Sequence, residues 1–75
     1  MKIPRRLILK IAFRLISERG EVSQLDIHAA IEEYLNRQLT IGDKIRITRV
    51  VESELSIAEV RREGEAKVRV YIFRR

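Results

Sequence analysis

The sequence predicts an α+β domain in which three helices are followed by a β-hairpin. Two stretches, Ser23 to Asp26 and Thr40 to Asp43, fit the capping box, in which a hydroxyl and a carboxylate three residues later satisfy free N–H groups at a helix start. Apolar residues at helical spacing follow both boxes. After Ile57 the apolar spacing changes from about 3.6 residues to 2, which indicates that strands follow the helices.

Length and composition indicate one small domain, residues 1–75. The 75 residues are 45% hydrophobic and 36% charged, with three glycines and one proline, which is typical of a folded chain. The sequence has no cysteine, so disulfides and thiolate metal sites are excluded. Lys10 and Arg14 interrupt the first apolar residues, so we expect neither a membrane span nor a secretory signal. We expect a cytoplasmic protein without a cofactor, a metal ion or a small-molecule substrate.

The net charge of +5 is unevenly distributed along the chain. Residues 1–20 contain six lysines and arginines and one glutamate, and residues 61–75 contain six and two glutamates. Residues 21–60 contain four lysines and arginines and eight acidic residues. Basic ends around an acidic middle favour an anionic partner that certain elements contact. A densely charged, solvated surface of the kind found in thermophile proteins is the alternative.

The first helix is expected over about residues 4–19, because proline suits a first turn and Gly20 suits a helix end. Its apolar side chains form two adjoining faces. One face contains Ile8, Ile11, Ala12 and Leu15, and the other contains Leu9, Phe13 and Ile16. So wide an apolar surface exceeds what a core of this size needs. We therefore expect the second face to form the interface of a homodimer.

The second helix is expected over about residues 24–36, after an extended segment, residues 21–23, that can form a β-bridge. Its buried stripe would contain Leu25, Ile27, Ala30, Ile31, Tyr34 and Leu35. His28 is the only histidine and has no cysteine with which to share a metal ion. We therefore expect His28 at the surface or half-buried.

The third helix is expected over about residues 41–55. Its β-branched residues would also suit a strand, but the Thr40 box and the helical spacing of its apolar residues favour a helix. These apolar residues are Ile41, Ile45, Ile47, Val50, Val51 and Leu55. Opposite them lies a polar strip of Gly42, Arg46, Arg49 and Ser53. Two guanidinium groups flanked by small side chains can approach a nucleic-acid groove closely. The alternative is a solvated charged face, which would show the same sequence pattern.

The hairpin is expected over about residues 57–73. A three-residue loop, residues 62–64, would place Val60 opposite Ala66 and keep the apolar residues of both strands on one face. In the second strand this face would contain Ala66, Val68, Val70 and Ile72, with Lys67, Arg69, Tyr71 and Phe73 on the other. Cations flank the tip of the hairpin, at Arg61, Arg62, Lys67 and Arg69, and Glu63 and Glu65 dilute the charge at the tip itself.

The order helix, extended link, helix, turn, helix and hairpin resembles the winged-helix DNA-binding domains, in particular the small stand-alone members from archaea and their viruses. The resemblance covers nearly the whole chain and rests on this architecture. It implies a double-stranded DNA-binding protein that regulates transcription. The third helix, with Gly42, Arg46, Arg49 and Ser53, would enter the major groove. The hairpin wing, with Arg61, Arg62 and Lys67, would contact the backbone, and a homodimer would bind a pseudo-palindromic site.

Other classes of function fit the sequence less well. An enzyme is not expected, because the sequence shows no nucleophile–base pair and no Gly-rich phosphate loop. Winged-helix domains also serve as protein–protein interaction adaptors, in which case the face with Leu9, Phe13 and Ile16 would bind the partner. A basic amphipathic first helix can also lie on an acidic membrane surface, but the core needs its apolar residues, so a membrane partner is not expected.

Overall fold

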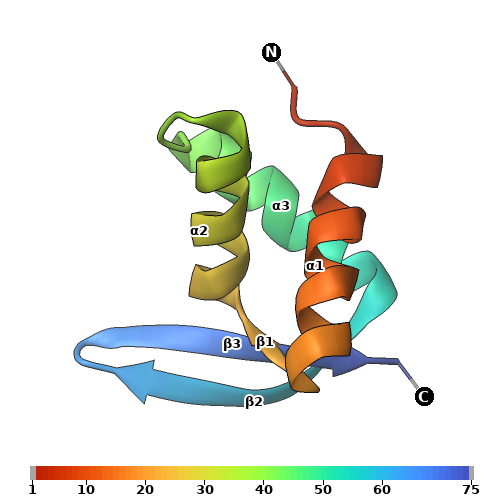
Figure 1. The fold of residues 1–75 in the computed structure, drawn as a ribbon. Helices are drawn as coiled ribbons and strands as arrows, with labels where there is room; N and C mark the ends of the chain where they lie inside the picture. Colours follow the sequence, from red (N-terminus) through yellow and green to blue (C-terminus); the bar gives the residue numbers. More distant parts are fainter. Residues whose placement is uncertain (1, 75) are drawn as a thin grey trace.

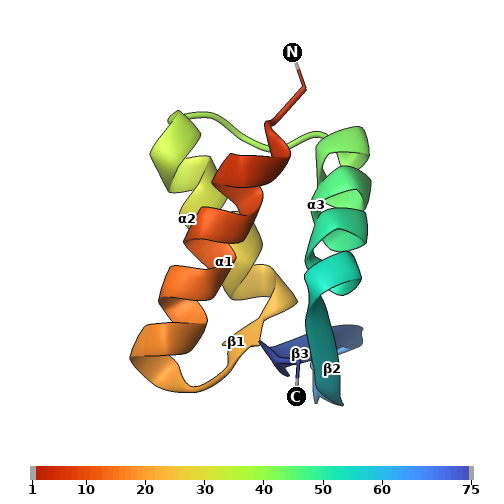
Figure 2. The ribbon, with the colours of Figure 1, turned by 90° about the vertical axis from the view of Figure 1, so that its right-hand side faces the viewer.

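The computed structural model describes residues 2–74, which form three helices and a three-stranded antiparallel sheet (Figure 1). In chain order the elements are α1 (Arg5–Arg19), β1 (Val22–Ser23), α2 (Gln24–Leu35), α3 (Ile41–Glu54), β2 (Leu55–Glu63) and β3 (Ala66–Phe73). The helices pack against one another on one side of the sheet, and the hairpin of β2 and β3 projects beyond them (Figures 1 and 2). The predicted α+β class is confirmed.

Side chains cap the N-termini of α2 and α3. At α3 the capping box is complete, because Thr40 Oγ1 accepts from the N–H of Asp43 at 3.1 Å and Asp43 Oδ2 accepts from the N–H of Thr40 at 3.0 Å. The Thr40 N–H and the guanidinium of Arg37 hold the pKa of Asp43 below its usual range. At α2 Ser23 Oγ accepts from the N–H of Asp26, whose carboxylate pairs with Arg19 at 3.4 Å. An ion pair therefore replaces the second half of the predicted box.

The β-branched segment of α3 is helical, as predicted. The complete cap fixes its first turn, and Ile47, Val50 and Val51 are then buried where α3 packs against α1 and α2. Helical spacing brings these three side chains to one face of the helix, whereas a strand would divide them between two faces. Burial against two other helices thus outweighs the strand propensity of the segment.

The core lies where the three helices meet the sheet. It is formed mainly by isoleucines, leucines and valines from all three helices, joined by Val22 of β1 and Tyr71 of β3. Its helical members include Ile8, Ile11, Leu15, Ile16, Ile27, Ile31, Ile47 and Val51. Each fully buried side chain of this size contributes about 1.5–3 kcal/mol relative to an exposed one, so this cluster is the main source of stability.

The outer face expected on α1 is largely used by the core. Ile16 is only 2% exposed, so its predicted place in a dimer interface is wrong. Leu9 is half-buried and packs against the core. Phe13 lies at the surface, and its ring centre is 5.7 Å from that of Phe73 at the end of β3. The wide apolar surface of α1 is largely buried because α1 packs against both α2 and α3.

The helix α2 is rotated relative to the prediction. Tyr34 is 67% exposed and Leu25 is also at the surface, although both were expected in the buried stripe. The buried residues of α2 are Ile27, His28 and Ile31. His28 is 9% exposed, more deeply buried than predicted, and its Nε2 has no hydrogen-bond partner among residues 2–74.

The sheet has the strand order β1-β3-β2, so β3 is central. The short strand β1 pairs antiparallel with β3, with Val22 opposite Tyr71 and Ser23 opposite Val70. The extended segment before α2 therefore forms the pairing that the sequence predicted. This pairing attaches the start of α2 to the base of the hairpin.

The hairpin turn is one residue shorter than predicted. Glu63 lies opposite Ala66, so the loop is Gly64 and Glu65, with Gly64 at a φ of 63°. Two-residue loops with a left-handed residue match the right-handed twist of the strands, and this preference outweighs the apolar pattern on which the longer loop was based. A bulge between Ile57 and Glu59 then shifts the register once more toward the base of the hairpin.

The shorter loop changes which residues face each other. Val60 lies opposite Arg69, not opposite Ala66. Val68 and Val70 are buried as expected, but Tyr71 on the opposite face of β3 is only 1% exposed and belongs to the core. Both faces of β3 are therefore covered near the base of the hairpin. Only the part of β3 between Tyr71 and the tip of the hairpin has the predicted outward face.

The burial of His28 predicts that stability falls in mild acid. Burial, and secondarily the charge of Lys44, lower the pKa of His28 below its ordinary value of 6.5. As the pH falls below that value the unfolded chain binds a proton that the folded chain does not, so the free energy of unfolding decreases, by at most about 1.4 kcal/mol per pH unit. Urea denaturation between about pH 7.5 and 5.5 measures this slope. The His28→Gln variant should lose it, and an equal slope in both proteins would contradict the assignment.

Candidate nucleic-acid interface

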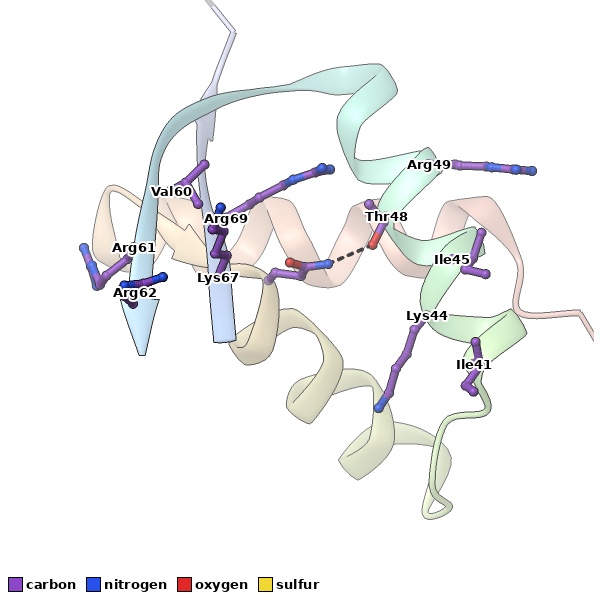
Figure 3. A pocket seen from close by; sticks show the side chains of 11 residues that line it. Ile41, Lys44, Ile45, Thr48, Arg49, Val60, Arg61, Arg62, Lys67 and Arg69 are labelled. Atoms are coloured by element: carbon purple, nitrogen blue, oxygen red, sulfur yellow. Dashed lines mark hydrogen bonds between the residues drawn. The ribbon is translucent and has the colours of Figure 1, made fainter. Parts of the chain in front are cut away.

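A groove lies between the outward face of α3 and the hairpin of β2 and β3 (Figure 3). We refer to it as the α3–hairpin groove. Its lining residues are Gln24, Ile41, Lys44, Ile45, Thr48, Arg49, Val60, Arg61, Arg62, Lys67 and Arg69. Six of them are lysines or arginines, and none carries a carboxylate. Two elements that follow each other in the chain thus build a surface of one charge sign.

The rotation of α3 decides which of its residues reach the groove. Because Ile47, Val50 and Val51 are buried, the residues of α3 that line the groove are Ile41, Lys44, Ile45, Thr48 and Arg49. Their spacing of three, four, seven and eight residues from Ile41 places them on one side of the helix. Ile41 is 79% exposed and Ile45 is 50% exposed, although both were expected to be buried.

The predicted strip of Gly42, Arg46, Arg49 and Ser53 therefore does not form one surface. Only Arg49 lines the groove. The Nε of Arg46 donates to the carbonyl of Ile3 at 2.8 Å and ties the segment before α1 to α3. Ser53 Oγ donates to the carbonyl of Val50 at 2.6 Å, within its own helix. Gly42 is exposed but lies outside the groove lining.

The predicted wing residues Arg61, Arg62 and Lys67 are all among the lining residues of the groove. Arg62 lies opposite Lys67, and Val60 lies opposite Arg69, so each pair projects from the same face of the two strands. Arg61 points the other way (Figure 3), where it pairs with Glu59 at 2.5 Å and with Glu21 at 3.1 Å. These two carboxylates raise the pKa of Arg61.

The six cations differ in whether a carboxylate already neutralises them. Arg61 is paired as described, and Arg69 pairs with Glu52 of α3. The other four make no ion pair with any of residues 2–74; they are Lys44, Arg49, Arg62 and Lys67. Two of these free cations lie on each side of the groove. Lys44 and Arg69 were not among the predicted site residues, because only the observed helix rotation and strand register bring them here.

A network centred on Glu52 holds the hairpin against α3. The carboxylate of Glu52 accepts from the guanidinium of Arg69 and, at 2.9 Å, from the hydroxyl of Tyr71. Burial and this carboxylate raise the pKa of Tyr71 well above its usual range, so the hydroxyl remains a donor. Beyond the core, Arg74 donates to the carbonyls of Glu52 and Ser53, both at 3.2 Å. The network therefore sets the position of the hairpin relative to α3.

The floor of the groove is closed by a bond between α2 and α3. The Nε2 of Gln24 donates to Thr48 Oγ1 at 3.1 Å, as the dashed line in Figure 3 shows. This bond occupies the two neutral polar side chains of the groove with each other. The other lining side chains are cations and apolar groups.

Residues 2–74 contain neither a cluster of metal-ligating side chains nor a membrane-spanning helix. In residues 2–74 no group of three or more His, Cys, Asp and Glu side chains is placed to hold a metal ion. None of the helices in these residues combines the length and the apolar character that a membrane span requires. Comparisons of the chain with protein-family models, with curated proteins and with solved structures give no match.

Glu52 provides a test of how the hairpin is held. We expect Glu52→Ala to lower the free energy of unfolding by about 1–3 kcal/mol, because it leaves the buried hydroxyl of Tyr71 without an acceptor. Urea denaturation measures the loss. The matched control is Glu54→Ala, which breaks a surface pair with Arg5 and should cost less than about 1 kcal/mol. Equal losses in the two variants would show that Glu52 does not anchor the hairpin.

Proposed function

We propose that the protein binds double-stranded DNA as a winged-helix domain and regulates transcription. In this proposal the outward face of α3 enters the major groove and the β2–β3 hairpin contacts the phosphate backbone. The observation that carries the proposal is the α3–hairpin groove, whose lining contains six cations and no carboxylate. Phosphate contacts by lysine and arginine provide most of the affinity in such complexes.

The arrangement of the free cations suits a duplex. A helix fits the major groove of B-DNA, and the phosphates of the two strands border that groove on both sides. Lys44 and Arg49 lie on α3, and Arg62 and Lys67 lie on the hairpin at the other side of the groove. The cations of α3 and of the hairpin can therefore contact phosphates while the outward face of α3 contacts the base edges.

The order of the elements also supports the proposal. Three helices are followed by a hairpin, and a short strand before α2 completes a three-stranded antiparallel sheet. This layout is compatible with a winged helix. We assign the DNA contacts to Lys44, Arg49, Arg62 and Lys67, and a structural role to Arg46, whose side chain is bound to the carbonyl of Ile3. The acidic residues Glu63 and Glu65 near the tip lie outside the groove lining.

A protein–protein adaptor is the second candidate, because apolar surface also occurs outside the groove. Phe13 and Phe73 are exposed and contact each other, and half-buried Leu9 lies one turn before Phe13 on α1. This patch would bind either a partner protein or a second copy of the chain. A homodimer formed here would present two copies of α3 to successive turns of DNA. Measurement of the molar mass in solution separates a dimer from a monomer.

The groove cations predict a specific change in salt dependence. We expect the triple variant Arg49→Gln, Arg62→Gln, Lys67→Gln to bind a random-sequence duplex more weakly. The slope of log affinity against log salt should decrease by about one for each lost phosphate contact. Fluorescence anisotropy between about 50 and 200 mM salt measures this slope.

The control for this experiment removes the same charge elsewhere. Arg6, Lys10 and Arg14 are exposed on α1 and, within residues 2–74, also make no ion pair. Their triple change to glutamine should leave the slope almost unaltered. Equal effects of the two triple variants would contradict the groove as the binding site. Absence of duplex binding by the unchanged protein at low salt would contradict DNA binding and favour the adaptor.

A further inference from the structure

Three large apolar side chains are exposed inside the basic groove. Ile41 and Ile45 lie one helical turn apart on α3, and Val60 faces the groove from β2. A single exposed apolar residue is normal on any protein surface. Here three of them line one groove that also contains cations of α3 and cations of the hairpin. A ligand that fits this surface must therefore present both negative charge and apolar groups.

The hydrogen-bonding groups of the groove restrict which base edges it can recognise. The charged groups that α3 offers there belong to Lys44 and Arg49, which can only donate. Thr48 Oγ1 accepts from Gln24, and the lining has no carboxylate, which is the group that accepts from the amino group of cytosine. Guanine presents two acceptors in the major groove, and thymine presents one acceptor and a methyl group. Apolar side chains in this position match the methyl group.

We propose that Ile41 and Ile45 contact the 5-methyl groups of thymines in the major groove, so that the protein prefers duplexes with thymines at the positions facing these residues. This inference rests on the proposed function. Along α3 the two isoleucines alternate with the cations Lys44 and Arg49. This arrangement matches the major groove, in which the base edges lie between two phosphate backbones. An acidic peptide with apolar side chains is the other occupant of matching chemistry. The duplex is favoured because Arg62 and Lys67 place cations on the opposite side of the same groove.

The experiment compares two short duplexes that differ only in the thymine methyl groups. One duplex is rich in A·T pairs, and in the other every thymine is replaced by deoxyuridine. This replacement keeps the base pairing and the minor-groove acceptors and removes only a major-groove methyl. We expect the unchanged protein to bind the deoxyuridine duplex more weakly, by about fourfold for each methyl group that is buried in the complex.

Variants of the two isoleucines show whether α3 senses the methyl groups. Both residues are at least half exposed, so Ile41→Ala, Ile45→Ala should fold normally, and alanine favours the helix. In this variant the affinities for the two duplexes should become equal, while the salt slope should not change. The matched control is Leu25→Ala, Tyr34→Ala, which removes exposed apolar side chains of α2 that lie outside the groove. The control should keep the preference of the unchanged protein.

The outcomes separate this inference from the proposed function. If the unchanged protein binds both duplexes with equal affinity, DNA binding stands and the methyl contact is refuted. A preference that persists in the isoleucine variant also refutes the contact, because another part of the protein then senses the methyl groups. If neither duplex is bound at low salt, both proposals fail. Equal duplex affinities together with tight binding of a peptide of alternating glutamate and leucine would assign the groove to a protein partner.

Discussion

The burial of Ile47, Val50 and Val51 fixes the rotation of α3 about its own axis, and the surface of the protein depends on this rotation. One residue of a helix occupies about 100° of its circumference, so a small rotation replaces one set of outward side chains with another. With these three residues inside, Ile41, Lys44, Ile45 and Arg49 line the groove. The same rotation directs Arg46 to the carbonyl of Ile3. Arg46 and Arg49 are only three residues apart, but Arg46 binds this carbonyl and Arg49 lines the groove.

The hairpin completes the groove only because it is held at a defined place. Its base is joined to the helices by the pairing of β1 with β3, by buried Tyr71 and by the carboxylate of Glu52. Toward its tip the strands pair only with each other, as the projection beyond the helices shows (Figure 1). A fixed base and a projecting tip are consistent with a hairpin whose cations meet a ligand from the side of α3.

The sequence predicted the elements well because local chemistry determines them. The Thr40 box starts a helix, Gly20 ends one with a φ of 85°, and the change of apolar spacing after Ile57 marks the strands. Each of these signals depends only on residues that are close together in the sequence. They do not require knowledge of which other element lies nearby.

The candidate site was predicted less completely, because its composition depends on tertiary packing. The apolar residues of α3 occupy so much of its circumference that the sequence allows several rotations, and only contact with α1 and α2 selects one. For this reason the sequence pattern does not identify Lys44 as a site residue. The sequence shows Arg69 as a hairpin cation, but the loop length determines that it lies opposite Val60, and tertiary packing brings it to Glu52. Ile16 was assigned to the surface because the sequence does not show that α1 has neighbours on two sides.

Ion pairing divides the cations of the groove into two groups with different consequences for a ligand. Arg61 and Arg69 already have carboxylate partners, so an anionic ligand must compete with Glu21, Glu59 or Glu52 for them. The free cations need no such exchange, and their neutralisation by phosphates releases the counterions that surround a duplex. The net charge of +5 alone does not distinguish these groups. Affinity for a polyanion should therefore follow the few unpaired cations that face Ile41 and Ile45, because those cations surround the part of the surface that can also make apolar contacts.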